Sequence, residues 1–330
     1  MKKILLCLLF IFCLVGCNGK TTTTTADTTT VAPNKSFKVI SPNGSPALAQ
    51  TYMQSTKPSL GNNVSYDIEI VSDATQLAAA MTSQSHEVVY APINLGTKMY
   101  NATGNYLLAA TVVFGNNYIV TATDEEFTLE SLNGKDIVLF GQNNVPAIVT
   151  LEILNANNIV PNSITYLPAT SDTKNELVTD PSKIVLLAEP SFSATKTALN
   201  NNGITNVKAI NLQDEWKKIT EDESYPQAGI FVNKTFANAN PEIVKAYIAE
   251  VEKSINYANA NVDVVAQMAV DLEYGFPLPV LKSAIPNSNL LFKKATDAKT
   301  LVEDLLQKII DSGNGALIGG KLPDEGFYFA

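Results

Sequence analysis

Short apolar runs rich in β-forming residues alternate with helical patterns along the chain, and this alternation constrains the fold more than any other feature. A first series of strands is predicted over 37–40, 66–71 and 87–91, with helices beginning near residues 47, 73 and 92. A second series is predicted over 136–140, 164–167, 184–187 and 207–212, with a last strand at 229–232. Strands that alternate with helices at this spacing form βαβ units, so the sequence predicts an α/β protein with mainly parallel sheets.

Two long apolar runs, 106–114 and 117–123, separate the two series and meet at Gly115-Asn116. After residue 232 the pattern changes to amphipathic helices over 241–260, 262–274 and 298–311. We interpret the runs as crossings between two lobes, each a mainly parallel sheet flanked by helices, with a helical C-terminal tail. The predicted lobe one comprises 36–116 plus 230–330, and lobe two comprises 117–229. In such sheets ligands bind beyond the carboxyl ends of the strands, so we expect a cleft between the lobes.

The composition excludes several classes of function. The 23 basic residues are all Lys, and the 32 acidic residues give a net charge of −9, so a nucleic-acid-binding protein is not expected. Without Arg, no guanidinium group can clamp an anionic ligand. The three Cys residues lie within the first 17 positions and His86 is the single His, so we expect no metal site, no cofactor and no catalytic triad in the folded body.

The N-terminus has the features of a secreted lipoprotein. Two Lys residues precede a 12-residue apolar run, 4–15, which is shorter than the ~20 residues of a membrane-spanning helix. The run ends in LVGC at 14–17, which resembles a bacterial lipobox. We therefore predict a signal peptide over 1–16, lipidation of Cys17 and an extracytoplasmic body anchored to the cell membrane; the alternative is an ordinary signal peptide that contains a Cys. The Thr-rich segment 17–35 is predicted to be a tether.

Further motifs make a family resemblance specific. They are NGSP at 43–46, GNNYIV at 115–120, LNGK at 132–135, AEP at 188–190 and IGGKLPD at 318–324. With the lipobox, they resemble the solute-binding proteins of ABC importers, in particular the group of thiamine-precursor, nitrate and alkanesulfonate receptors. The resemblance implies a type II periplasmic-binding-protein fold, a monomer that captures a small solute by hinge closure, and an ABC permease with its ATPase as partners. It implies no catalytic residues.

Candidate binding residues lie on the loops that follow the predicted strands. The loop Asn43-Gly44-Ser45-Pro46 offers an amide, a hydroxyl and backbone N–H groups at a helix N-terminus, although a simple turn with an N-cap has the same residues. Gln142 and Asn143 are the corresponding amides in lobe two, with a surface turn as the alternative. The full predicted set is Asn43, Gly44, Ser45, Pro46, Asn94, Phe114, Asn116, Gln142, Asn143, Glu189 and Phe192.

Three members of this set raise separate questions. Glu189 directly follows a strand, so it either attracts a cationic group in the cleft or makes an interlobe or helix-dipole contact. Phe114 and Phe192 either stack on a planar ligand or pack in the core. With amides and one carboxylate available, the predicted ligand is a small neutral or weakly cationic heterocycle, such as a vitamin precursor. Two other functions stay open: an enzyme of the thiamine-pyrimidine or menaquinone-pathway type on the same fold, and a sensory or adhesive lipoprotein.

Overall fold

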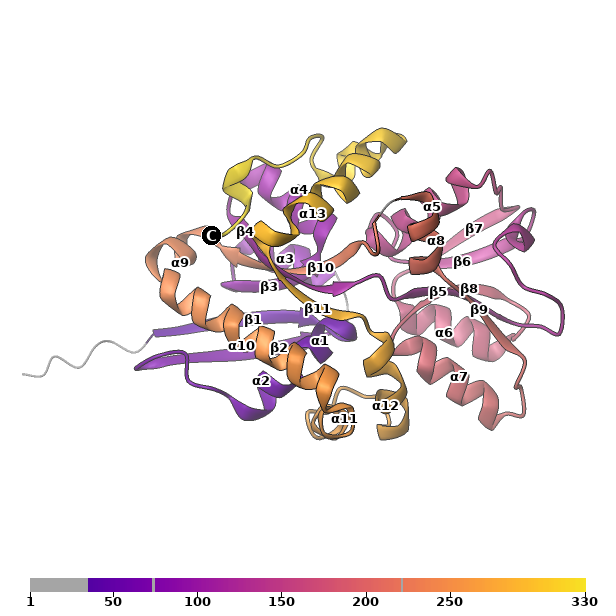
Figure 1. Cartoon of the computed structure of the whole chain (residues 1–330), viewed down its shortest axis with the longest axis horizontal. Helices are drawn as coiled ribbons and strands as arrows, with labels where there is room; N and C mark the ends of the chain where they lie inside the picture. The colour runs from indigo at the N-terminus through magenta and orange to yellow at the C-terminus, as the bar shows by residue number, and fades with distance from the viewer. Residues whose placement is uncertain (1–34, 73–74, 221) are drawn as a thin grey trace, which may run out of the picture. The chain divides into compact units, whose positions relative to one another are not determined.

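Two β-sheets flanked by helices make up the part of the chain that this computed structural model describes, residues 35–72, 75–220 and 222–330 (Figure 1). The predicted signal peptide, Cys17 and the tether as far as residue 34 lie outside the described residues. The predicted fold class, an α/β architecture with two sheets and a C-terminal helical segment, is confirmed.

The first sheet has six strands in the order β11-β4-β10-β3-β1-β2. Its strands are β1 (Lys35–Pro42), β2 (Val64–Val71), β3 (Val88–Pro92), β4 (Tyr106–Phe114), β10 (Pro226–Asn233) and β11 (Leu290–Lys294). β1 pairs in parallel with β2 and β3, whereas β10 runs antiparallel to both of its neighbours, β3 and β4. The returning strand β10 is therefore inserted into the middle of a sheet that the first half of the chain builds.

The second sheet has five strands in the order β7-β6-β8-β5-β9. They are β5 (Asn117–Ala122), β6 (Asp136–Phe140), β7 (Ser163–Leu167), β8 (Ile184–Ala188) and β9 (Val207–Asn211). β6 pairs in parallel with β7 and β8, and β5 runs antiparallel to β8 and β9. β4 leads into β5 through Gly115-Asn116. The reversed strands are β10 and β11 in the first sheet and β5 in the second, and β5 and β10 lie next to the crossings between the sheets. The proposed lobe boundary at 229/230 falls inside β10.

Helices cover both faces of each sheet (Figure 1). Around the first sheet lie α1 (Ser45–Ala49), α2 (Thr51–Thr56), α3 (Thr75–Ser83), α4 (Ile93–Thr103), α9 (Lys234–Ala239), α10 (Pro241–Ala260), α11 (Val262–Asp271), α12 (Leu278–Asn287) and α13 (Ala295–Ile309). Around the second lie α5 (Val145–Ala156), α6 (Thr170–Thr179), α7 (Ser191–Asn201) and α8 (Leu212–Ile219). Covered on both faces and paired on both edges, β4 is buried at all nine positions, which explains its long apolar run.

The elements that the sequence analysis missed have weak local signals. α6 buries only Thr173 and Leu177, so its sequence shows no apolar stripe. α12 contains Pro286 near its end, a residue that normally indicates a helix boundary. By contrast, α10 begins at Pro241, a residue type favoured in the first helical turn, and covers the range that its periodicity predicts.

Gly96 on α4 permits close packing against the first sheet. A Cβ at this position would overlap the ring of Phe231, which is fully buried on β10. We expect Gly96→Ala to lower the free energy of unfolding by about 1–3 kcal/mol, because overpacking outweighs the better helix propensity of Ala. Chemical denaturation checks this value. The matched control is Gly315→Ala, whose backbone is helical and whose Cβ would make only ordinary contacts; equal losses in both variants would contradict the steric explanation.

Candidate ligand-binding site

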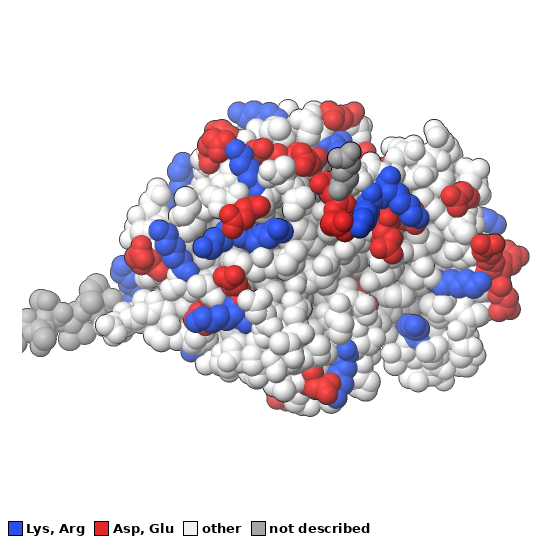
Figure 2. All heavy atoms as spheres, viewed as in Figure 1, with Lys and Arg blue, Asp and Glu red and all other residues white. Residues whose placement is uncertain are grey.

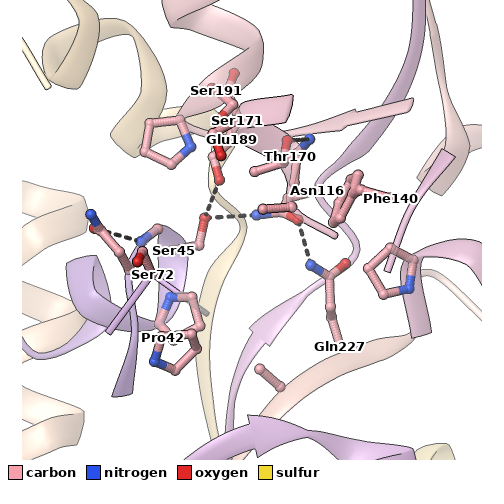
Figure 3. Close-up of a pocket in the computed structure, with 18 of the residues that line it drawn as sticks. Pro42, Ser45, Ser72, Asn116, Phe140, Thr170, Ser171, Glu189, Ser191 and Gln227 are labelled. Atoms are coloured by element: carbon pink, nitrogen blue, oxygen red, sulfur yellow. Dashed lines mark hydrogen bonds between the residues drawn. The ribbon is translucent and has the colours of Figure 1, made fainter. Parts of the chain in front are cut away.

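A pocket of about 240 Å³ lies between the two sheets, where the carboxyl ends of their parallel strands face each other (Figure 3). Its residues directly follow or end β1, β2, β3, β6, β7 and β8, and β10 adds two more. The lining consists of Pro42, Asn43, Gly44, Ser45, Pro46, Ser72, Pro92, Asn116, Phe140, Pro146, Ala169, Thr170, Ser171, Ala188, Glu189, Pro190, Ser191, Gln227, Ala228 and Phe276. This is the place where α/β sheets bind ligands.

The loop after β1 forms one wall of the pocket. Gly44 has φ +114°, a conformation that residues with a Cβ rarely adopt, so the turn into α1 requires glycine. Asn43 stabilises this turn, because its Oδ1 accepts a hydrogen bond from Gly44 N at 2.8 Å and its Nδ2 donates to Tyr274 O at 3.0 Å. The predicted role of this loop as part of the site and its alternative as a capped turn are therefore compatible.

A continuous set of hydrogen bonds runs along the pocket between the two sheets (Figure 3). Gln227 Nε2 donates to Asn116 Oδ1 at 2.8 Å, and Asn116 Nδ2 donates to Ser45 Oγ at 2.7 Å. Ser45 Oγ in turn donates to the backbone oxygen of Glu189 at 3.1 Å. The loop that precedes α1 is thus bonded to the segment that follows β8, on the other side of the pocket.

Glu189 is the one ionisable side chain among the described lining residues. It is 3% exposed, and its two carboxyl oxygens accept hydrogen bonds from Ser193 N and Ser193 Oγ at 3.2 and 3.0 Å. Burial raises the pKa of the Glu189 carboxyl to about 7, against the opposing effect of the bonds from Ser193. The side chain therefore makes the helix N-terminal contact that was one of its two predicted roles, at the start of α7.

The N-terminal ends of four helices of the two sheets also reach the pocket. Pro92 precedes α4, Pro146 lies in the first turn of α5, Thr170 begins α6 and Ser191 begins α7. Helix N-termini carry partial positive charge and unpaired N–H groups. The pocket therefore combines the partial positive charge of helix N-termini with the Glu189 carboxyl group, and no Lys belongs to its described lining.

The structure brings some of the predicted site residues together and separates others. Those in the pocket lining are Asn43, Gly44, Ser45, Pro46, Asn116 and Glu189. Those outside it are Asn94, Phe114, Gln142, Asn143 and Phe192.

Each residue outside the lining has a physical reason for its position. Asn94 is buried and donates from Nδ2 to Asn143 O at 2.8 Å, so it bonds the start of α4 to the loop after β6. The side chains of Gln142 and Asn143 are exposed on that loop. Phe114 is fully buried at the end of β4, and Phe192 stacks on Tyr118 with a centroid distance of 4.4 Å. The Phe114 ring is buried in the core, and the partly buried Phe192 ring packs against Tyr118.

Several lining residues were not predicted. They are Ser72, Phe140, Thr170, Ser171, Ser191, Gln227 and Phe276, with four prolines and three alanines beside them. Thr170 and Ser171 could have been found from their position three and four residues after the predicted strand 164–167, had α6 been recognised. Gln227 gave no local signal, because it lies in an ordinary strand and reaches the site through the antiparallel insertion of β10.

The described residues contain no helix that is long and apolar enough to cross a membrane. They also contain no cluster of three or more His, Cys, Asp or Glu side chains that could hold a metal ion.

Comparisons with known proteins connect this geometry to a family. No curated protein sequence matches the chain significantly. Among solved structures, an ABC transporter protein from Parabacteroides distasonis matches with a TM-score of 0.74 and 18% identity, covering 89% of this chain and 99% of that one. The periplasmic aliphatic sulphonate binding protein SsuA from Escherichia coli matches with a TM-score of 0.71 and 13% identity, covering 90% and 98%. At these identities the likeness establishes the fold.

A third structure, the periplasmic nitrate-binding protein NrtA from Synechocystis, matches with a TM-score of 0.64 and 12% identity over 86% of this chain and 85% of that one. The family model described as NMT1/THI5 like matches residues 69–263, more than half of the 330 residues. The resemblance predicted from the sequence motifs is confirmed at the level of family and fold. The chain belongs to the NMT1/THI5-like family and has the fold of periplasmic substrate-binding proteins.

Proposed function

We propose that this chain is the solute-binding lipoprotein of an ABC importer, which captures a small organic solute between its two lobes and delivers it to a permease. The observation that carries this proposal is the pocket at the carboxyl ends of the strands of both sheets, bridged by the bonds from Asn116 to Ser45 and from Ser45 to Glu189 O. Structural relatives that are named as binding proteins for sulphonates and nitrate support the same role.

In the proposed mechanism, the predicted lobes 36–116 plus 230–330 and 117–229 move about the crossings near Gly115 and Pro226. Residues 226–229 move with lobe one, because β10 pairs with β3 and β4. Opening separates Ser45 from Glu189 O and Asn94 from Asn143 O, whereas closure restores these bonds around the solute. No covalent step is needed. The chemistry of the pocket favours binding over catalysis, because both oxygens of Glu189, its one described ionisable group, are already bonded to Ser193.

The test begins with native mass spectrometry of the freshly purified protein, which identifies a retained solute by its mass. After the solute is removed by partial unfolding and dialysis, the same compound is titrated back while small-angle scattering is recorded. We expect the body to become more compact on saturation. Turnover of the solute into a product of different mass would favour an enzyme on this fold. A gene without permease and ATPase genes beside it would favour a sensory protein.

The proposed membrane anchor makes a separate prediction. If Cys17 carries the lipid, Cys17→Ser should move the protein from the membrane fraction to the soluble fraction and abolish labelling by a radioactive fatty acid. Fractionation and autoradiography of cells that express each form give the result. Cys13→Ser is the matched control, because this Cys lies inside the predicted signal peptide and should leave anchoring intact. Unchanged membrane partition of Cys17→Ser would contradict the lipoprotein assignment.

A further inference from the structure

The hydrogen bonds along the pocket have a direction that a single backbone carbonyl determines. Glu189 O carries no hydrogen, so the one hydroxyl hydrogen of Ser45 is used in the bond that it donates there. Ser45 Oγ therefore accepts from its other partner, Asn116, and the Asn116 atom that faces it must be Nδ2. The amide orientation of Asn116 follows from this bonding and not from the shape of its side chain.

The orientation of the Asn116 amide also determines that of the Gln227 amide. Asn116 Oδ1 faces Gln227, which must donate through Nε2, and Gln227 Oε1 then accepts from Asn117 Nδ2 at 2.7 Å. Asn117 Nδ2 also donates to Tyr225 OH at 3.0 Å, so the orientation of the buried Asn117 amide is fixed by two hydrogen bonds. Each amide oxygen in the lining is thus engaged by a neighbouring amide.

A pair of donors remains for a ligand, beside the second lone pair of each amide oxygen. An amide nitrogen carries two hydrogens, and the bonds described use one on Asn116 Nδ2 and one on Gln227 Nε2. No described residue accepts a second hydrogen bond from either nitrogen, and both side chains line the pocket. This edge of the pocket therefore offers an N–H group on each side chain to which an acceptor atom of a ligand can bond.

The charges and walls of the pocket restrict the ligand further. A full anion would meet the Glu189 carboxyl group and no Lys among the described lining residues, whereas a cation would meet N–H groups and helix N-termini. Five prolines and two phenylalanines give the walls flat apolar surfaces. The volume of about 240 Å³ is below the ~300–1,000 Å³ of pockets for drug-sized molecules, so it suits one ring.

We propose that Gln227, oriented through Asn116 and Ser45, determines the specificity of this pocket by donating to an uncharged acceptor atom at the edge of a single planar ring. The acceptor is a ring nitrogen or a carbonyl oxygen. This inference rests on the proposed solute-binding function and adds to it the chemical class of the ligand and the residue that selects it.

The experiment compares the binding of small probes of similar size to the ligand-free protein. Nuclear magnetic resonance of the side-chain amide groups measures the affinity of each probe. The probes are pyridazine, which has two ring acceptors, benzene, which has none, the cation N-methylpyridinium and the anion methanesulfonate. We expect pyridazine to bind at least about tenfold more tightly than benzene, as one or two added hydrogen bonds imply. We also expect it to shift the amide signals of Asn116 and Gln227.

Three variants test the residues. Gln227→Leu should reduce the preference for pyridazine over benzene to near unity, and Ser45→Ala should weaken it although both amides remain, because the orienting hydroxyl is lost. Gln307→Leu is the matched control, since Gln307 is exposed on α13 and bonds only to Asp311 among the described residues. Its preference should equal that of the unmodified protein. A preference that survives Gln227→Leu overturns the proposal.

Other outcomes separate this inference from the proposed function. Tighter binding of N-methylpyridinium or methanesulfonate would overturn the assignment of an uncharged acceptor and leave a solute receptor in place. The same conclusion would follow if no probe bound while the protein still became compact around its own retained solute. If neither the probes nor a retained solute bound at all, both the inference and the proposed function would be wrong.

Discussion

Replacing Trp216 with alanine should lower the free energy of unfolding by about 3–5 kcal/mol, the range found for the removal of large buried aromatic side chains. Trp216 is the single Trp of the chain and is 1% exposed. Its ring packs edge-on against Tyr225 with a centroid distance of 5.3 Å, and Lys308 Nζ lies 5.9 Å above it. Removing it would leave a cavity between α8, the crossing into β10 and α13.

Urea denaturation followed by far-ultraviolet circular dichroism measures this effect without relying on the lost fluorophore. Trp216→Phe is the matched control, because it keeps an aromatic ring and removes an indole N–H that has no hydrogen-bond partner among the described residues. Its loss should be clearly smaller than that of Trp216→Ala. A loss below about 1 kcal/mol for the alanine variant would show that the site collapses without cost, contrary to this expectation.

Glu189→Gln should raise the free energy of unfolding, relative to the unmodified protein, more at alkaline pH than at acidic pH. The pKa of the Glu189 carboxyl is raised from its ordinary value of 4.5 to about 7 by burial, so the folded state holds this proton more tightly than the unfolded chain. Stability from this group is therefore fully present below pH 4.5 and is lost as the pH rises through 7. Gln does not titrate, so the variant escapes the loss.

The size of the effect follows from the pKa shift. A difference of this order corresponds to about 2–4 kcal/mol between the two ends of the window. We expect the free energy of unfolding of Glu189→Gln minus that of the unmodified protein to grow by this amount between pH 4.5 and pH 8. Equilibrium denaturation at a series of pH values gives the curve, and taking the difference between variants removes the contribution of all other groups.

Ser193→Ala provides a matched test of the cause. Ser193 Oγ donates to Glu189 Oε1, and this bond lowers the pKa that burial raises. Without the hydroxyl, the midpoint of the pH-dependent loss should move to higher pH. A flat difference curve for Glu189→Gln would mean that the carboxyl is hydrated in solution, and an unmoved midpoint in Ser193→Ala would mean that the bond to the hydroxyl does not form.

Much of the fold could be predicted because burial has a period that depends on secondary structure. The alternation of apolar runs and helical patterns indicated the strands of both sheets, and the separate pair of runs at 106–114 and 117–123 marked the crossing. α6, α12 and β11 could not be predicted, since α6 has few buried residues, α12 contains Pro286 and β11 buries only Leu290. The boundaries of the lobes remain a proposal.

The candidate site could also be predicted only in part from the sequence. The loop Asn43-Gly44-Ser45-Pro46 was recognised because a helix that starts directly after a strand places its first residues at the ligand edge of a sheet. For Phe114 and Phe192 both ligand stacking and core packing stayed open, because an aromatic residue near a strand end has the same local pattern whether it faces a pocket or the core. In the structure Phe114 is fully buried and Phe192 stacks on Tyr118, and neither lines the pocket.

By itself the sequence determined the fold class, the strand-end loops and, through its lack of Arg, the kinds of ligand clamp that are impossible. Only the tertiary structure decided which of these loops meet. Ser45 and Glu189 O are 144 positions apart, and Asn116 and Gln227 are 111 apart. Local sequence patterns indicate whether a side chain is buried. They do not indicate which residues bury it or bond to it, because that depends on how β5 and β10 insert into the sheets. The role of Gln227 exists only because that insertion brings a strand from late in the chain to the pocket.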